Sequence, residues 1–157
     1  MSATGLEVFD RTLQLTNVWL DDIMREMGWT DRHKAYHALR VVLHTLRERL
    51  PPAETARLSA QLPMLIRGMF FEGWRPGHVP VAEYSRDEFL MHITDSFVFD
   101  MEADSRQIAT AVLRVLARHI SSGEAEKIRF LLPESCRELW PAPNESPLSP
   151  ARSATAS

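Results

Sequence analysis

The feature that most constrains the fold is an ungapped match between the two halves of the chain. When each residue is compared with the one 70 positions later, Leu62-Pro63 aligns with Leu132-Pro133 and Arg67 aligns with Arg137. Apolar residues match at the same offset, in the pairs Trp19/Phe89, Leu20/Leu90, Ile23/Ile93, Val42/Val112, Leu43/Leu113, Leu46/Leu116, Leu50/Ile120 and Leu58/Ile128. A shared helical period explains some of the apolar matches, but it explains neither the proline nor the ungapped length. We therefore infer two related halves.

These repeats, about residues 11–72 and 85–141, are each expected to bury an apolar face against the other. Apolar residues recur every three or four positions through both, which predicts helices, and the two longest, about 31–50 and 102–120, should lie at the centre. Ser85 with Glu88 forms a capping box, and prolines divide the shorter helices. We expect an all-α fold, a compact helical bundle in a single domain over residues 1–141. A Pro- and Ser-rich segment, 142–157, is expected to be a disordered tail.

Composition agrees with a globular domain and argues against several classes of protein. Of 157 residues, 45% are hydrophobic and 25% are charged, and the net charge of −3 gives no sign of a nucleic-acid partner. A single cysteine, Cys136, excludes an internal disulfide and a cysteine metal cage. The sequence has no apolar run of the roughly 18 residues that span a bilayer and no signal-peptide pattern. We expect a cytoplasmic protein without integral membrane association.

Three stretches also resemble a known family. They are residues 29–50, the segment Gln61-Leu-Pro-Met-Leu-Ile-Arg-Gly followed by Glu72-Gly-Trp-Arg-Pro76, and the Leu-Pro to Leu-Trp140-Pro ending. On these motifs the chain is similar, over about residues 5–141, to the bacterial domain-of-unknown-function family 2267. The resemblance implies a small bacterial all-helical protein, and it implies no activity, because the motifs are structural signatures.

Histidines and arginines supply the candidate ligand contacts. His33 and His37 lie one helical turn apart on the side of the 31–50 helix opposite its apolar stripe, where two imidazoles could hold a transition metal. Two ligands are too few for a tight site, and the alternative is an exposed polar face that gains charge below about pH 6.5. Arg67 and Arg137 could form a pair of anion contacts, or each could tie a helix end or pair with a neighbouring carboxylate. We expect no cofactor.

The stretch Met64–Trp74 is the candidate interaction surface. It holds more apolar residues than one helix face can bury, and its aromatic members Phe70, Phe71 and Trp74 extend beyond the Leu-Pro-x-x-x-Arg part shared by the repeats. Methionine and aromatic residues are typical of adaptable contact surfaces. The alternative is that the stretch only caps the core between the two halves.

The sequence shows no recognisable catalytic set, and we lean towards a non-enzyme. The acidic group Asp21, Asp22 and Glu26 is interpreted as a solvated helix face, because no partner at a defined distance can be placed. The first hypothesis is a non-catalytic interaction or scaffold protein that self-associates, for instance as a homodimer, or binds an unidentified protein partner. The second is a small-ligand or metal-binding protein with a site between the two helical halves.

Overall fold

The computed structural model describes residues 2–82 and 85–142, and the regular secondary structure in these ranges is all helical, as predicted. The predicted disordered tail lies outside the described residues except for Ala142. The elements are α1 (Glu7–Met27), α2 (Arg32–Arg47), α3 (Pro52–Ser59), α4 (Met64–Phe71), η1 (Pro76–His78), α5 (Arg86–Ser96), α6 (Ser105–His119), α7 (Ser122–Leu131) and η2 (Glu134–Leu139), of which η1 and η2 are 3-10 helices. Within the described ranges, every helix is too short or too polar to cross a membrane.

Local sequence sets the helix ends. Asp31 and Asp104 begin α2 and α6, each side chain accepting two backbone N–H groups of the first turn. Ser85 and Ser121 begin α5 and α7 in the same way, each with one accepted N–H. Caps of this kind contribute about 1 kcal/mol each. Gly28 ends α1 with a left-handed backbone (φ 69°), a conformation that glycine adopts without strain.

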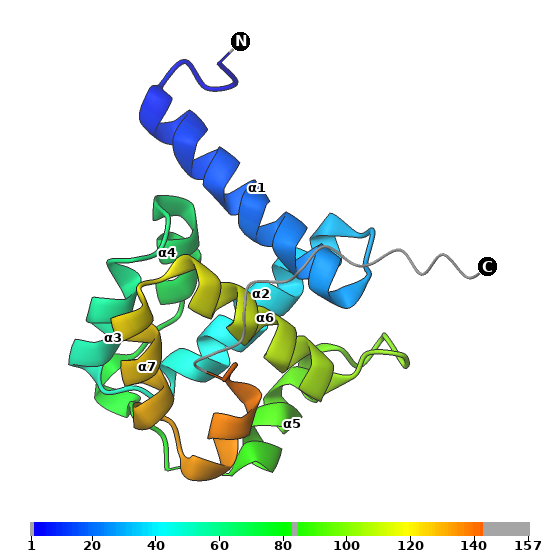
Figure 1. Ribbon diagram of the computed structural model, residues 1–157, viewed down its shortest axis with the longest axis vertical. Helices are drawn as coiled ribbons and strands as arrows, with labels where there is room; N and C mark the ends of the chain where they lie inside the picture. The colour runs from blue at the N-terminus through cyan, green and yellow to red at the C-terminus, as the bar shows by residue number, and fades with distance from the viewer. Residues whose placement is uncertain (1, 83–84, 143–157) are drawn as a thin grey trace.

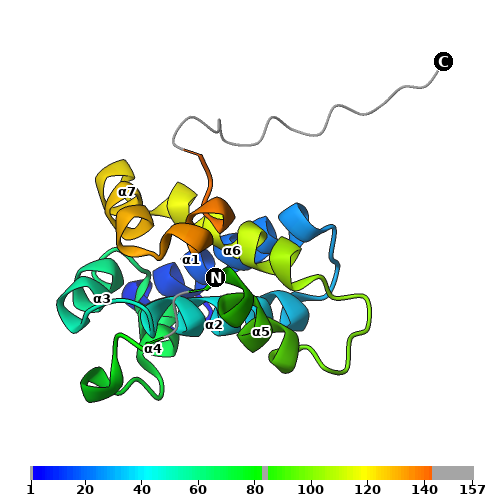
Figure 2. The ribbon, with the colours of Figure 1, turned by 90° about the horizontal axis from the view of Figure 1, so that it is seen from below.

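The two central helices, α2 and α6, pack against each other, and both α1 and α5 pack across the pair. Figure 2 shows the resulting layers, with α6, α7 and η2 on one side and α2, α3, α4 and α5 on the other. The element α4 packs against α1 and α2, while η2 packs against α5 and α6. Figure 1 shows α1 crossing the molecule diagonally, with α3, α4 and α7 at the side away from the α5–α6 loop. In each half, the first long helix (α1 or α5) packs against both central helices, and the last element (α4 or η2) packs against that helix and one central helix. Two related halves would produce this arrangement, although the duplication itself stays a prediction.

Contacts at equivalent positions follow the same pattern. The Trp19 ring stacks on His119 with centroids 4.8 Å apart, and 70 positions away the Arg49 guanidinium lies 5.0 Å from the centroid of Phe89. Each pair joins α1 or α5 to the end of the opposite central helix. One continuous core therefore crosses both halves, and its largest fully buried side chains include Trp19, Phe70, Phe89, Ile23, Leu39, Leu43 and Ile108.

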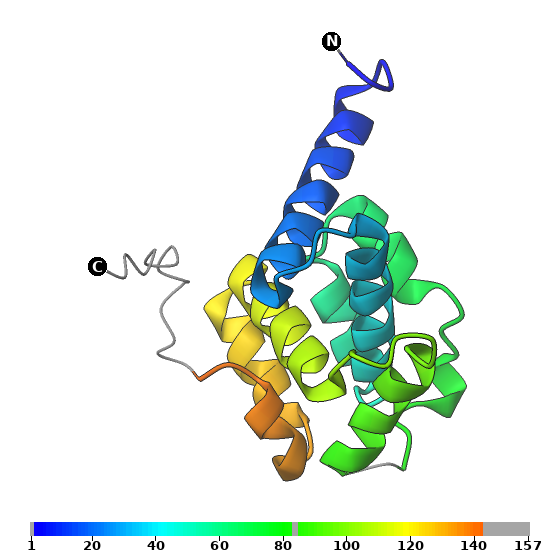
Figure 3. The same ribbon diagram turned by 90° about the vertical axis from the view of Figure 1, so that its right-hand side faces the viewer.

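Helix α1 breaks the correspondence between the halves. It has 21 residues, whereas α5 has 11 and begins at the position equivalent to residue 16 of α1. The additional turns, residues 7–15, extend beyond the helical body at the N-terminal end of the molecule (Figure 3). These protruding turns give the molecule a surface that the second half lacks.

Candidate functional site

An apolar groove lies between the protruding turns of α1, the first turns of α2, and α4. Its volume is about 950 Å³, which is within the range of ligand-binding clefts. Five large apolar side chains on its walls are between 37% and 50% exposed; they are Phe9, Leu13, Tyr36, Met64 and Leu65. Contiguous exposed apolar surface of this kind marks interaction sites in soluble proteins.

Helix α4, one wall of the groove, is fastened to α1 at its N-terminal end. Pro63 precedes the helix, and the N–H of Leu65 has no partner within it because it belongs to the first turn. The hydroxyl of Thr12 in α1 accepts that N–H at 2.9 Å. The contact sets the distance between two walls of the groove.

The other end of α4 is held by cationic and imidazole groups of α2. The Arg47 guanidinium donates from Nη1 to the carbonyl oxygens of Phe70, at 2.6 Å, and Glu72, at 2.7 Å. His44 Nε2 lies 2.7 Å from the Met69 carbonyl oxygen. Carbonyls at a helix C-terminus lack intrahelical donors and carry partial negative charge, so these contacts fix α4 against α2. The groove is therefore formed before any partner binds.

Protonation states follow from the same contacts. Burial lowers the pKa of His44, and the nearby Arg47 and Arg40 lower it further, so the neutral ring donates its Nε2–H to Met69. A two-fold hydrogen bond from Arg40, at 2.8 and 3.0 Å, lowers the pKa of Glu72. Among the described residues, Glu72 is the one carboxylate that lines the groove, and it stays ionised with its charge balanced by Arg40.

The face of α2 opposite its apolar stripe is therefore less exposed than the sequence suggested. Arg47 is only 5% exposed, because α4 and the turn after it cover the guanidinium. Helical periodicity places Arg47 with His33 and Arg40 on one polar side, and it carries no signal that another helix end would pack there.

The two predicted metal ligands have different surroundings. His37 Nε2 donates to the Ser96 carbonyl oxygen at 2.7 Å, and its ring lies 4.8 Å from that of Phe97. His33 lies exposed at the rim of the groove, with its ring edge towards Tyr36. In residues 2–82 and 85–142, no group of three or more His, Cys, Asp or Glu side chains could hold a metal ion.

Of the predicted interaction surface, Phe70 is a core residue, and its assignment to a contact surface is wrong. It is completely buried because Ile66 and Phe70, one turn apart, point from α4 into the core. Phe71 lies between Phe70 and Trp74, with ring centroids 5.3 Å from each, and both Phe71 and Trp74 are partly buried. The accessible apolar side chains of this stretch are instead those of Met64 and Leu65, in the first turn of α4.

The two predicted anion contacts bind backbone carbonyls. Arg67 donates from Nε to the Ser59 carbonyl oxygen at 2.8 Å and from Nη2 to that of Leu62 at 3.1 Å. Arg137 donates from Nη2 to the Phe130 carbonyl oxygen at 3.1 Å. Each guanidinium ties the end of the preceding helix, which is one of the two alternatives to anion binding that the sequence left open.

A buried ion network between α1 and α6 was missed from the sequence. The Asp22 carboxylate lies 2.7 Å from His119 Nε2, and the Glu26 carboxylate accepts from Arg114 at 3.2 Å and Arg118 at 2.9 Å. The Glu26 side chain is only 5% exposed, so these carboxylates do not form a solvated face. The partners come from residues about 90 positions away, which periodicity within one helix cannot indicate.

The same network contains a carboxylate–imidazole pair, which is one part of a nucleophile–base set. Asp22 orients His119 as a carboxylate orients a general base, but among the described residues no hydroxyl or thiol hydrogen-bonds to that imidazole. Cys136 lies elsewhere, and burial raises the pKa of its thiol, which keeps it protonated. The network is best explained as the attachment of α1 to α6.

A second hollow lies between the halves, where α2 faces α5. Its volume is about 390 Å³, and its basic lining consists of His37, Arg40, His44, Arg49 and His92. Arg40 is held by Glu72, and His37 and His44 donate to backbone carbonyls. Most of its hydrogen-bonding capacity is therefore engaged within the chain.

Comparison with protein families matches residues 16–139 to the family described as "Uncharacterized conserved protein (DUF2267)". No curated protein matches the chain. The family match begins inside α1, so the protruding turns, which form one wall of the groove, precede it.

Proposed function

We propose that this chain, which belongs to the family described as "Uncharacterized conserved protein (DUF2267)", is a non-catalytic protein that self-associates through its apolar groove. The observation that carries the proposal is the set of five half-exposed apolar side chains around that groove. Fully burying one such side chain contributes about 1.5–3 kcal/mol, and each is already about half buried. Covering the five side chains therefore contributes about 4–8 kcal/mol towards the free-energy cost of association. We also propose a cytoplasmic location, which rests on the sequence prediction.

Preorganisation of the groove strengthens this proposal. Because α4 is fixed at both ends, by Thr12 and by Arg47 with His44, its exposed residues are presented in a defined geometry. A surface that is already ordered loses less conformational entropy when it is covered. A second copy is the partner we propose, since every copy presents the same groove.

Light scattering over a range of concentrations tests the proposal. Wild-type protein should show a mass that rises above the 17.9 kDa of one chain. Leu65→Asp should return the mass to that of one chain, because it places a charge on the groove wall. The matched control is Phe130→Asp, an equally conspicuous exposed apolar residue (62% exposed) on α7, which does not line the groove. A wild-type protein that stays monomeric at millimolar concentration contradicts the proposal.

A second candidate function is the binding of a small anion in the hollow between α2 and α5. It is supported by the basic lining of the hollow and by its position between the two halves, and it requires Arg40, His37 and His44 to exchange their internal partners for the anion. A thermal-shift panel of anionic metabolites and divalent metals tests it. Stabilisation that is lost in His92→Ala supports this function, and no stabilisation by any member of the panel removes it.

A further inference from the structure

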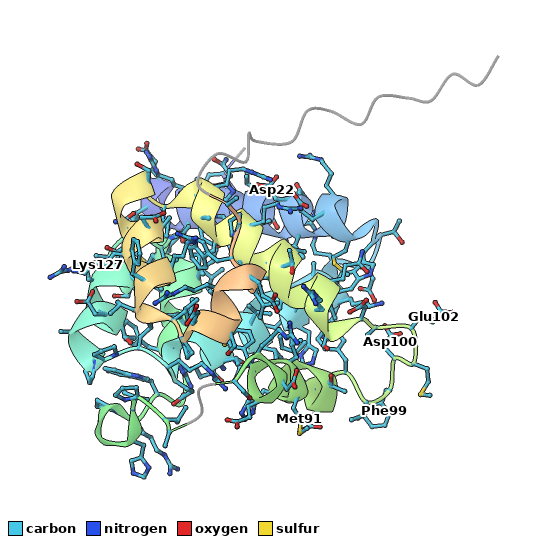
Figure 4. The ribbon with its side chains drawn as sticks, turned by 60° about the horizontal axis from the view of Figure 1, so that its bottom comes forward. Asp22, Met91, Phe99, Asp100, Glu102 and Lys127 are labelled. Carbon is cyan, nitrogen blue, oxygen red and sulfur yellow. The ribbon has the colours of Figure 1, made fainter. Side chains whose placement is uncertain are left out.

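The two most exposed large apolar side chains of the described residues, Phe99 and Met101, lie on the loop between α5 and α6, beside the exposed Val98. Phe99 is 100% exposed, Met101 is 95% exposed and Val98 is 59% exposed. We call residues 98–103 the Phe99 loop. In Figure 4 this loop projects from the helical body, with Phe99 turned to solvent on the same side as Met91 of α5. A convex apolar feature therefore exists on the same chain as the concave groove.

Hydrogen bonds and an ion pair hold the Phe99 loop in shape. The Asp100 carboxylate lies 2.5 Å from Lys34 Nζ in α2 and accepts the N–H of Glu102 at 3.1 Å. The Asp100 backbone donates to the Phe97 carbonyl oxygen at 3.0 Å and accepts from Ala103 at 3.2 Å. The hydrogen bond from Lys34 also lowers the pKa of Asp100, so the pair stays charged at neutral pH. The aromatic ring is thus presented from an ordered turn.

The first half of the chain shows what an aromatic residue at this position can do within the fold. Trp29, 70 positions before Phe99, is partly buried against the core. Its ring lies 6.4 Å from that of Phe97 and 4.4 Å from Lys34 Nζ. At the equivalent place in the second half the aromatic ring points away from the core, where it contributes nothing to the stability of one copy. Exposed aromatic residues of this kind are typical anchors of protein contacts.

We propose that the Phe99 loop of one copy fills the apolar groove of a second copy. This inference rests on the proposed function and names the part of the second copy that covers the groove. A convex loop can fill a hollow, whereas two grooves pressed face to face would leave both partly empty, and empty volume forfeits dispersion contacts. Charge agrees: Glu102 lies in the loop and Asp104 directly follows it, while the groove carries Arg32.

Because the groove is lined by α1, α2 and α4 and the loop joins α5 to α6, one copy offers both at once. Arg32 is shared with Asp21, at 2.7 Å, so the apolar contact rather than charge carries the association. Two copies that exchange loops reciprocally close as a two-fold dimer, whereas a loop given to one copy and a groove filled by another joins copies head to tail into a ring or an open chain.

A mixing experiment tests this arrangement. Leu65→Asp disables the groove and Phe99→Asp disables the loop, so each variant alone should be monomeric, with association weakened on the order of 30-fold or more. A 1:1 mixture should regain one intact contact, the loop of Leu65→Asp in the groove of Phe99→Asp, and give a mass of twice 17.9 kDa with no growth beyond it. The double variant has neither an intact groove nor an intact loop. Its mixture with either single variant should therefore show the mass of one chain.

Each other outcome has a defined meaning. If both variants are monomeric but their mixture stays monomeric, the loop of one copy does not fill the groove of another and the inference fails. If Leu65→Asp abolishes association while Phe99→Asp leaves it unchanged, another segment fills the groove; the inference fails and the proposed function stands. Association that survives Leu65→Asp removes the proposed function itself. Equal melting temperatures of the variants and the wild type exclude unfolding, and Met64→Asp replaces Leu65→Asp where that variant is unstable.

Discussion

Replacement of Arg47 by leucine removes two of the three hydrogen bonds described above that hold the C-terminal end of α4 against α2. The two accepted carbonyl oxygens, of Phe70 and Glu72, are left facing a side chain that cannot donate. Leucine fills much of the space, so the main effect is the loss of polar contacts to a buried site rather than a cavity.

The magnitude follows from the geometry. Hydrogen bonds to a charged donor contribute about 1.5–3 kcal/mol each, and the Nη1 distances of 2.6 and 2.7 Å are short. Losing two of them, partly offset by the apolar burial of leucine, should lower the free energy of unfolding by about 3–5 kcal/mol. For a chain of 157 residues this corresponds to a fall in melting temperature of about 6–20 °C.

Circular dichroism with thermal and urea unfolding measures this loss, and Arg40→Leu is the matched control. Arg40 lies on the same helix and pairs with Glu72, but its side chain is partly exposed and its carboxylate partner is mostly exposed. An ion pair of that kind contributes about 0–1 kcal/mol. If Arg47→Leu lowers the free energy of unfolding no more than Arg40→Leu does, the buried hydrogen bonds from Arg47 to the α4 carbonyls do not contribute the stability worked out above.

Three further predictions concern stability. Burial, and after it the nearby Glu54, raises the pKa of the Glu124 carboxyl above its ordinary 4.5. The folded state therefore binds this proton more tightly than the unfolded state, and stability falls as the pH rises from about 4.5 through the raised pKa. Glu124→Gln should raise the melting temperature at pH 8 and change it little at pH 4, and a lower melting temperature at pH 8 would contradict this. Phe70→Ala should lower the free energy of unfolding, measured in urea, by about 3–5 kcal/mol, and Phe71→Ala should lower it clearly less, because of these two only Phe70 is fully buried. Equal losses would contradict the difference in burial between the two rings. Thr12→Val leaves the Leu65 N–H without its acceptor and should cost about 1 kcal/mol, with faster hydrogen exchange at that amide; unchanged exchange would refute the contact.

Both surfaces proposed for association lie where the two halves differ. The protruding turns of α1 have no equivalent in α5, and they supply Phe9 and Leu13 to the groove. The outward ring of Phe99 stands where the first half buries Trp29. Residues that obey the repeat are explained by the shared core, so departures from it are the places where a contact with another molecule is to be sought.

The sequence by itself determined the local structure of this protein. Hydrophobic periodicity, the Ser85 cap and the placement of prolines predicted the main helices to within a few residues at their ends, because these signals act over short stretches of the chain. The apolar stripe of α2 was correct for the same reason, since residues such as Leu39 and Leu43 are fully buried. The family resemblance was likewise correct in the family it named.

Only the tertiary structure decided which polar groups are buried and where a hollow forms. Arg47 and Asp22 looked solvent-facing on their own helices, and they are buried because a helix end or a distant cation covers them. Phe70 looked like surplus apolar surface, and the core absorbs it. The groove has walls from three separate helices, so no single stretch of sequence contains it. These outcomes depend on contacts between residues tens of positions apart, which periodicity and capping do not encode.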